Sequence, residues 1–178
     1  MPSVIYHVRF RCAEDYMARR LPHRPAHLRQ LDTLRGEGRV VAGGPEPDGA
    51  YANIFYRVAN RAELKRLLAD NEFTRAGLFA DSLARAFVDF LEPVEWLPLD
   101  AGLKVTIVEG PVDDRARARA GLAELQRDCH IVFGGFFDDG AGLAIVRLVD
   151  PGESIRVLAA AGGWTAGRLV ARAWSQTL

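Results

Sequence analysis

The chain has 178 residues, and its 23 Lys and Arg residues balance its 23 Asp and Glu residues. This balance argues against a protein that binds nucleic acid or an anionic membrane mainly by charge, because such proteins carry a surplus of positive charge. Hydrophobic residues make up 49% of the chain, as in ordinary globular proteins, so extensive disorder is not expected. The length allows one domain or two small ones.

The sequence gives few signals of a compartment or of a metal. Cys12 and Cys129 are too few and too far apart for a disulfide framework or a zinc site. The N-terminal residues alternate like a strand from Val4 onward and lack the basic leader and apolar stretch of a signal peptide. No window approaches the roughly 18 uninterrupted apolar residues of a membrane-spanning helix. We therefore expect a cytoplasmic protein without a metal ion and without membrane or nucleic-acid partners.

The first half of the chain predicts a strand, a helix, two strands, a helix and a strand. Alternating apolar residues from Val4 to Phe10 predict the first strand, and leucines at helical spacing after Pro25 predict a helix that ends near Gly36 and Gly38. The later elements of this half are strands at 39–42, 52–58 and 83–91 and a helix after Asn60, which is placed to cap it.

The second half predicts the same order of elements. Its expected strands are at 103–108, 130–133, 143–149 and 169–176, and its expected helices are at 113–128 and 154–161. The two halves also match when residue n is set against residue n+91, where Gly43-Gly44 falls on Gly134-Gly135 and Asp48-Gly49-Ala50 falls on Asp139-Gly140-Ala141. We interpret this long ungapped match as a tandem duplication.

Two such units predict an α+β fold made of two ferredoxin-like βαββαβ units. A unit of this kind forms an antiparallel sheet with both helices on one face, so its other face has to be covered by something else. The connection at 93–102 is long enough for the second sheet to pack face to face with the first. We expect domains at 1–92 and 103–178, joined as an intramolecular pseudo-dimeric α/β barrel.

A group of motifs in the first half occurs in a characteristic order. Arg24-Pro25-Ala26-His27-Leu28 is followed by Gly43-Gly44-Pro45 and then by Ala69-Asp70. With these motifs, residues 4–92 resemble the YCII-related family, whose fold belongs to the dimeric α/β-barrel superfamily. The resemblance implies a catalytic or binding pair of His27 and Asp70. It also implies chemistry on small molecules, because one relative is similar to a dehydrochlorinase of a chlorinated hydroxyquinol and muconolactone isomerases share the superfamily.

Two features depart from the family pattern. Asn71 follows Asp70, where the family usually has proline, so the backbone is less constrained there. At the offset of 91, Ala118 stands opposite His27 and Ala161 stands opposite Asp70, so the second half lacks both polar groups. We therefore expect one site in each chain.

The candidate residues fit acid/base chemistry on a small ring. The imidazole of His27 can take up or release a proton near neutral pH, and Asp70 can accept the other ring N–H and fix the tautomer. Arg24 is a candidate anchor for an anionic substrate, and Tyr6 can supply a phenolic hydrogen bond. We expect a cofactor-independent lyase or isomerase that acts on a cyclic, oxygenated substrate.

Plainer interpretations stay open for each of these residues. His27 can be a packed or capping residue, Asp70 a solvated carboxylate at a helix end, Arg24 a surface charge and Tyr6 a core residue. His23 lies four residues before His27, as helical metal ligands do, but Pro25 intervenes and a third ligand is not evident.

Two other functions and two oligomeric states also stay open. The alternative functions are a non-catalytic small-ligand-binding or accessory protein of the same fold, and a purely structural partner. The chain can be a monomer, as an internal pseudo-dimer, or a homo-oligomer that pairs exposed strand edges.

Overall fold

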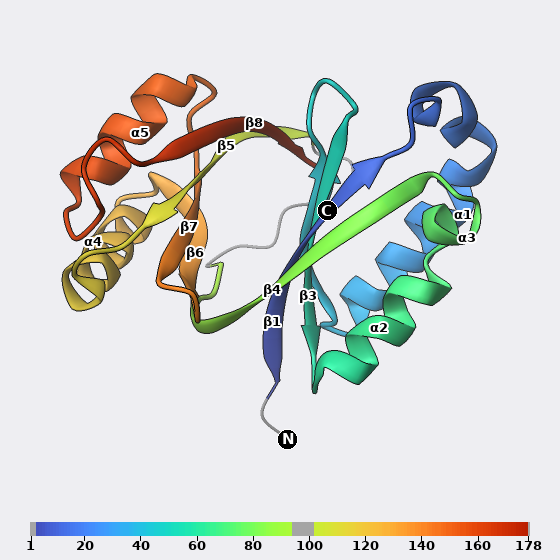
Figure 1. Ribbon diagram of the computed structural model, residues 1–178, viewed down its shortest axis with the longest axis horizontal. Helices are drawn as coiled ribbons and strands as arrows, with labels where there is room; N and C mark the ends of the chain where they lie inside the picture. Colours follow the sequence, from blue (N-terminus) through green and yellow to red (C-terminus); the bar gives the residue numbers. More distant parts are fainter. Residues whose placement is uncertain (1–2, 94–101, 178) are drawn as a thin grey trace. The chain divides into compact units, whose positions relative to one another are not determined.

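The computed structural model describes residues 3–93 and 102–177. Among these residues the chain forms two compact units, one of residues 3–86, 102 and 176–177 and the other of residues 87–93 and 103–175 (Figure 1). Both units contain the predicted order of strands and helices, and the first has one additional short helix. The predicted α+β class with two βαββαβ units is therefore confirmed.

The first unit is an antiparallel sheet covered by helices. Its elements are β1 (Val4–Cys12), α1 (Tyr16–Gly36), β2 (Val40–Pro45), β3 (Tyr51–Val58), α2 (Arg61–Asp70), α3 (Glu72–Arg75) and the first part of β4 (Phe79–Leu91). The strand order is β2-β3-β1-β4, and each neighbouring pair is antiparallel. All three helices of this unit lie on the same face of the sheet (Figure 1).

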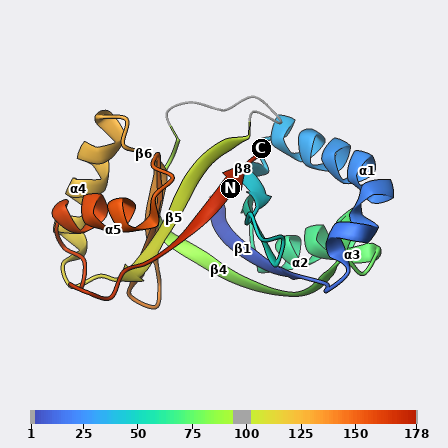
Figure 2. The ribbon, with the colours of Figure 1, turned by 90° about the horizontal axis from the view of Figure 1, so that it is seen from above.

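The second unit repeats this arrangement. Its elements are the last part of β4, β5 (Leu103–Pro111), α4 (Arg115–Arg127), β6 (Ile131–Phe137), β7 (Ala141–Val146), α5 (Pro151–Ala160) and β8 (Val170–Gln176). The strand order is β4-β6-β7-β5-β8. Its two helices lie next to each other in Figure 2, and their buried Leu122 and Leu158 belong to one apolar cluster with Val108 and Phe136 of the sheet.

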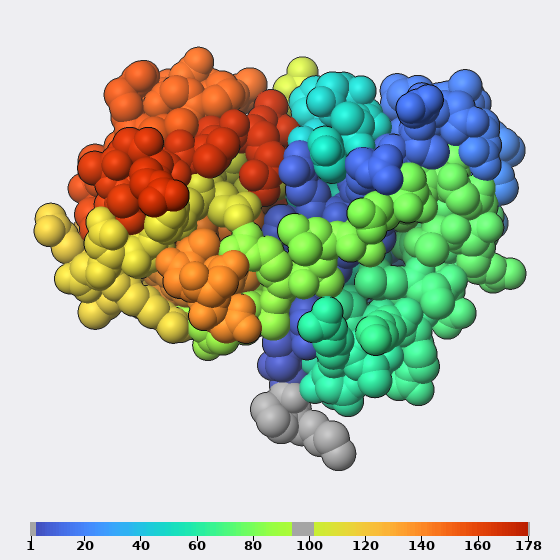
Figure 3. Space-filling model, in the orientation of Figure 1, coloured from blue at the N-terminus to red at the C-terminus, as the bar shows by residue number. Residues whose placement is uncertain are grey.

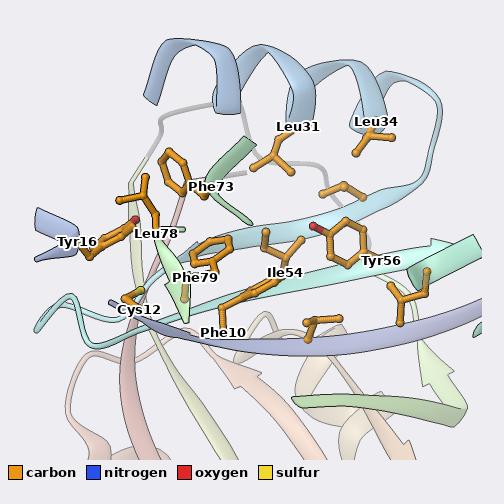
Figure 4. Close-up of a cluster of buried hydrophobic side chains, with 14 of the residues drawn as sticks. Phe10, Cys12, Tyr16, Leu31, Leu34, Ile54, Tyr56, Phe73, Leu78 and Phe79 are labelled. Atoms are coloured by element: carbon orange, nitrogen blue, oxygen red, sulfur yellow. The ribbon is translucent and has the colours of Figure 1, made fainter. Parts of the chain in front are cut away.

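The apolar core of the first unit lies between its helices and its sheet. Leu31 and Leu34 point from α1 toward Ile54 and Tyr56 of β3 (Figure 4). Leucines three residues apart share one face of a helix, and alternate residues of a strand share one face of a sheet, which explains why these four meet. Near the start of α1 the same core becomes aromatic, through Tyr16, Phe73, Phe79 and Phe10.

The start of α1 differs from the sequence prediction. The helix begins at Tyr16, well before Pro25, and holds both Pro22 and Pro25 within it. Proline is unfavourable inside a helix because it lacks the N–H that would bond to the preceding turn, so the prediction stopped at these residues. The structure continues through them and thereby brings Tyr16 and Arg20 onto the same helix as His27.

The end of β8 returns to the first unit. The backbone N–H of Thr177 donates to the carbonyl of Gly43 in β2 at 2.9 Å.

Ala80 to Leu83 of β4 are exposed, and this part of the strand lies at the surface in Figure 3. Within the described ranges, 3–93 and 102–177, no helix has the length and apolar character needed to cross a membrane.

Candidate functional site

A pocket of about 260 Å³ opens in the first unit beside α1. Residues from α1, β2, β3, α3 and β4 line it, together with Thr177 at the end of the described chain. Its lining residues are Tyr16, Arg20, Arg24, His27, Leu28, Leu31, Gly44, Pro45, Ala52, Ile54, Phe73, Phe79 and Thr177. The pocket therefore combines an aromatic and aliphatic wall with two arginines and one histidine.

His27 is held in this wall between aromatic rings. Its side chain is only 7% exposed. The imidazole stacks on Phe73 with a centroid distance of 3.7 Å and meets the ring of Phe79 edge-on at 6.2 Å. Stacking of this kind fixes the plane of a ring, so the two nitrogens of His27 have fixed directions.

The two ring nitrogens of His27 have different environments. Nδ1 is buried and has no hydrogen-bond partner among the described residues. The side chain of Asn71 acts on the ring in the direction that raises the pKa of His27, as an acceptor of a ring N–H does. The amide oxygen of Asn71 accepts the backbone N–H groups of Phe73 at 2.9 Å and Thr74 at 3.4 Å, which fixes its orientation.

Burial keeps His27 neutral at ordinary pH. Loss of solvent lowers its pKa from 6.5 to about 4, because a charged imidazolium is poorly solvated in an apolar wall. The carboxylate of Glu72 and the bond from Asn71 act in the opposite direction, and Arg24 adds to the lowering. The result is an unprotonated base in contact with the pocket.

The predicted partner Asp70 lies elsewhere. It is the last residue of α2 and is exposed, and among the described residues no hydrogen bond joins it to His27. Its backbone carbonyl accepts a hydrogen bond of 2.8 Å from the Gln30 side chain. The carboxylate that influences His27 is that of Glu72, which also lies 2.8 Å from Nδ1 of His23. The His27–Asp70 pair is therefore not hydrogen-bonded in this structure, and its role stays a prediction.

Arg24 lies within α1, and its role as an anion contact stays a prediction. It lines the pocket together with Arg20, which precedes it by one helical turn. The guanidinium of Arg20 lies 5.5 Å from the ring centroid of Tyr16, and its side chain hydrogen-bonds to Tyr16. Two positive charges consequently border the same pocket as the neutral imidazole.

Tyr6 and His7 are not part of the pocket wall. Tyr6 is half-buried against the core on the helix side of the sheet, as the plainer interpretation expected. His7 lies on the opposite side, where its ring stacks on Phe55 and Nε2 donates to Oδ1 of Asn53 at 2.9 Å. The amide of Asn53 in turn donates to Glu46 at 3.1 Å. A role for Tyr6 in binding stays a prediction.

The second unit has small residues at the positions that correspond to the site. Ala118 and Ala161 correspond to His27 and Asp70 at the offset of 91, and Ala118 is fully buried. Gly121 corresponds to Gln30, and a Cβ atom placed on it would lie 2.6 Å from the carbonyl oxygen of Ala161. The helices α4 and α5 therefore approach closely at a point where the first unit uses a side-chain hydrogen bond.

Sequence reasoning missed several pocket residues. Tyr16 and Arg20 were missed because the helix was expected to begin near Pro25, although Tyr16, Arg20, Arg24 and His27 have the spacing of one helical face. Asn71 was noted only as a departure from the family pattern. Thr177 gave no signal in the sequence, because its place depends on a contact between distant parts of the chain.

A metal site is not indicated by the side chains that the structure places. Among residues 3–93 and 102–177, no three or more His, Cys, Asp and Glu residues are grouped so that they could hold a metal ion. His23, the neighbour of His27 along the helix, is instead paired with Glu72. The polar side chains that line the pocket are those of Tyr16, Arg20, Arg24, His27 and Thr177.

Comparison with known proteins identifies the first unit. The YCII-related domain model matches residues 4–87. Among curated proteins none matches the chain. The match covers β1 to the middle of β4 and contains every residue that lines the pocket except Thr177.

Two putative monooxygenases of known structure share the fold over almost the whole chain. A putative monooxygenase from Lactobacillus acidophilus NCFM is 9% identical, with a TM-score of 0.63 and coverage of 100% of this chain and 95% of that one. A putative monooxygenase from Fusobacterium nucleatum is 7% identical, with a TM-score of 0.63 and coverage of 99% and 93%. The 5-chloro-2-hydroxyhydroquinone dehydrochlorinase from Burkholderia phenoliruptrix AC1100 is 20% identical, with a TM-score of 0.41 and coverage of 45% and 89%.

Proposed function

Because residues 4–87 form a domain of the YCII-related family, we propose that the chain is a small-molecule enzyme whose substrate binds in the pocket beside His27. The reaction is of the lyase or isomerase type on a cyclic, oxygenated molecule, with His27 as the acid/base group. The single observation that carries the proposal is that His27, a residue of the pocket wall, has a buried Nδ1 without a partner among the described residues. A buried polar atom without a partner costs free energy unless a ligand supplies one.

The proposed chemistry follows from the protonation state of His27. Its neutral Nδ1 removes a proton from a carbon next to a carbonyl group of the ring, and the C–H electron pair becomes part of a new double bond. In a lyase the leaving group departs with its bonding electron pair, and in an isomerase the proton returns from Nδ1 to another carbon. The hydrogen bond to Asn71 holds the ring in the tautomer that this step needs.

Two arguments compete over the group that supports His27. The family resemblance assigns this role to Asp70, whereas the contacts of the ring favour Asn71 and Glu72. The variants Asp70→Asn and Asn71→Ala separate the two. We expect Asn71→Ala to alter the pH dependence of turnover, because it removes the bond that fixes the tautomer, and Asp70→Asn to do so only if the family-based pair forms with substrate bound.

The test is a conversion assay with and without the imidazole. The wild-type chain and His27→Gln are incubated with a panel of halogenated hydroxyquinones and unsaturated cyclic lactones, and products are followed by halide release and mass spectrometry. We expect His27→Gln to lower kcat by about 10² to 10⁴, the usual contribution of a general base. Equal rates for His27→Gln and the wild type would refute the assignment. Leu28→Ala, on the same helix, controls for a general disturbance of the pocket.

One observation favours the alternative of a binding protein without catalysis. Among the residues that the structure describes, His27 has no hydrogen-bonded carboxylate, although such a group commonly orients a catalytic histidine. A non-catalytic role predicts saturable binding of panel compounds by the wild type with no product. It also predicts that His27→Gln weakens binding without changing any rate.

A further inference from the structure

Arg20 has an unusual environment for a helical arginine. It lies on the face of α1 that also carries Arg24 and His27, and it lines the pocket with both. Its guanidinium contacts the Tyr16 side chain, which provides a hydrogen bond and a ring face but no negative charge. The nearest acid along the helix, Asp15, is bound by Arg19 at 3.0 Å.

One N–H group of Arg20 lacks an acceptor. The Nε atom is buried and has no hydrogen-bond partner among the described residues. A guanidinium donor without a partner in a protected place is costly, more so than a neutral donor. Arg20 lines the pocket, so an acceptor bound there can pair with its guanidinium, and a carboxylate is the best such acceptor because two parallel hydrogen bonds form.

The charge of the pocket wall also favours an anionic ligand. The residues that line it include two arginines and, among those the structure describes, no Asp or Glu. The neutral His27 does not offset the positive charge of the two arginines. An anion is therefore the ligand charge that this wall accommodates.

The rest of the wall sets the shape of the ligand. Phe73 and Phe79 form aromatic surfaces beside His27, and Leu31 and Ile54 complete the apolar part. A cavity of about 150 Å³ holds one benzene molecule, so the 260 Å³ here has room for one ring with polar substituents.

We propose that the pocket binds a planar ring that carries a carboxylate, with the carboxylate on Arg20 and a ring hydroxyl donating to Nδ1 of His27. This inference rests on the proposed function for the location of the ligand, and it adds the ligand class and a residue, Arg20, that determines specificity. Arg24 also lines the pocket and adds a second positive charge.

The test compares an acid with its neutral counterpart by calorimetry. The probes are 2,5-dihydroxybenzoate and 1,4-dihydroxybenzene, which share the ring and the hydroxyl groups and differ in the carboxylate. We expect the wild type to bind the acid at least 10-fold more tightly. Arg20→Gln should lose about 10- to 100-fold in affinity for the acid, as expected for a charge-assisted pair, and keep its affinity for the diol.

Controls separate this inference from the proposed reaction. Arg29→Gln, at an exposed position of α1 outside the pocket wall, should keep the preference for the acid. His27→Gln should also keep it, so loss of catalysis alone would not affect the inference. An unchanged preference in Arg20→Gln, equal binding of both probes by the wild type, or binding of neither probe would overturn it.

Discussion

His27 links the stability of the first unit to pH. Its pKa falls from 6.5 to about 4 on folding because the ring is buried, so the unfolded chain takes up a proton at a pH where the native chain does not. As pH falls from about 6.5 to about 4, the unfolded state is favoured by up to about 3 kcal/mol through this one residue. Above that window the group has no such effect.

Replacing His27 should remove this pH dependence. We expect the free energy of unfolding of His27→Gln to vary less steeply between pH 4 and pH 6.5, by up to about 1.4 kcal/mol per pH unit. Urea unfolding at a series of pH values measures the slope. Leu28→Ala also lowers stability but keeps the imidazole, so its slope should equal that of the wild type. An unaltered slope in His27→Gln would show that the ring is protonated in the native state.

At the residue scale, the sequence indicated two residues that line the pocket but not their surroundings. The Arg24 to Leu28 motif pointed to His27 and Arg24, and both border the pocket. The low pKa of His27 depends on Phe73 and Phe79, whose rings arrive from other elements. No local pattern reports such long-range burial, so the sequence suggested a titrating histidine near pH 7 where the structure holds a neutral one.

The helices of the two units pack against each other differently at the positions of Gln30 and Gly121. In the first unit the Gln30 side chain donates to the carbonyl of Asp70 and accepts the backbone N–H of Glu72 at 3.0 Å. In the second unit Gly121 stands at the position of Gln30 and brings the backbone of α4 directly against Ala161. A spacer side chain therefore separates the helices in the unit with the pocket, and close contact joins them in the other.

The close packing at Gly121 predicts that an added methyl group lowers stability there, whereas the same change at the open position of Gly36 does not. Gly121→Ala places a Cβ 2.6 Å from the carbonyl oxygen and 2.8 Å from the Cβ of Ala161, so we expect a loss of about 1–3 kcal/mol in the free energy of unfolding. Gly36→Ala, at the end of α1, meets no atom within 4 Å and should be neutral or stabilising by up to about 1 kcal/mol. Urea denaturation measures both. Equal effects would contradict close packing at Gly121.

At the element scale, regular periodicity gave most strands and helices. Asn60 does cap α2, with its side chain accepting the backbone N–H of Glu63 at 3.0 Å. The error concerned the first helix, where Pro22 and Pro25 are tolerated inside α1 because packing of Tyr16 and Leu31 into the core outweighs the lost backbone bonds. The short helix α3 also escaped prediction, since its first turn depends on the cap by Asn71.

At the scale of the molecule, the element order of both units could be predicted, whereas the tandem duplication and the expected boundaries at residues 92 and 103 stay predictions. The pocket wall itself joins residues far apart in the sequence, from Tyr16 to Thr177. Periodicity carries no information about such a contact. For this reason the C-terminal contribution to the pocket was not expected.

The backbone hydrogen bond from Thr177 to Gly43 allows the contribution of Thr177 to the pocket to be tested. Thr177→Pro removes the backbone N–H that donates to the Gly43 carbonyl, so one wall of the pocket loses its attachment. We expect about 2- to 10-fold weaker binding of 2,5-dihydroxybenzoate, the value of one ordinary hydrogen bond, while Thr177→Ser retains wild-type affinity. Calorimetry measures the affinity of both variants for 2,5-dihydroxybenzoate. Wild-type affinity in Thr177→Pro would mean that this attachment does not shape the pocket.

The position of Thr177 also bears on how the chain matures during synthesis. A ribosome releases Tyr16 through Phe79 long before Thr177, and domains generally begin to fold as they emerge. The matched domain can thus assemble its core early, before Thr177 completes the lining of the pocket. The complete pocket therefore exists only after synthesis has passed residue 177.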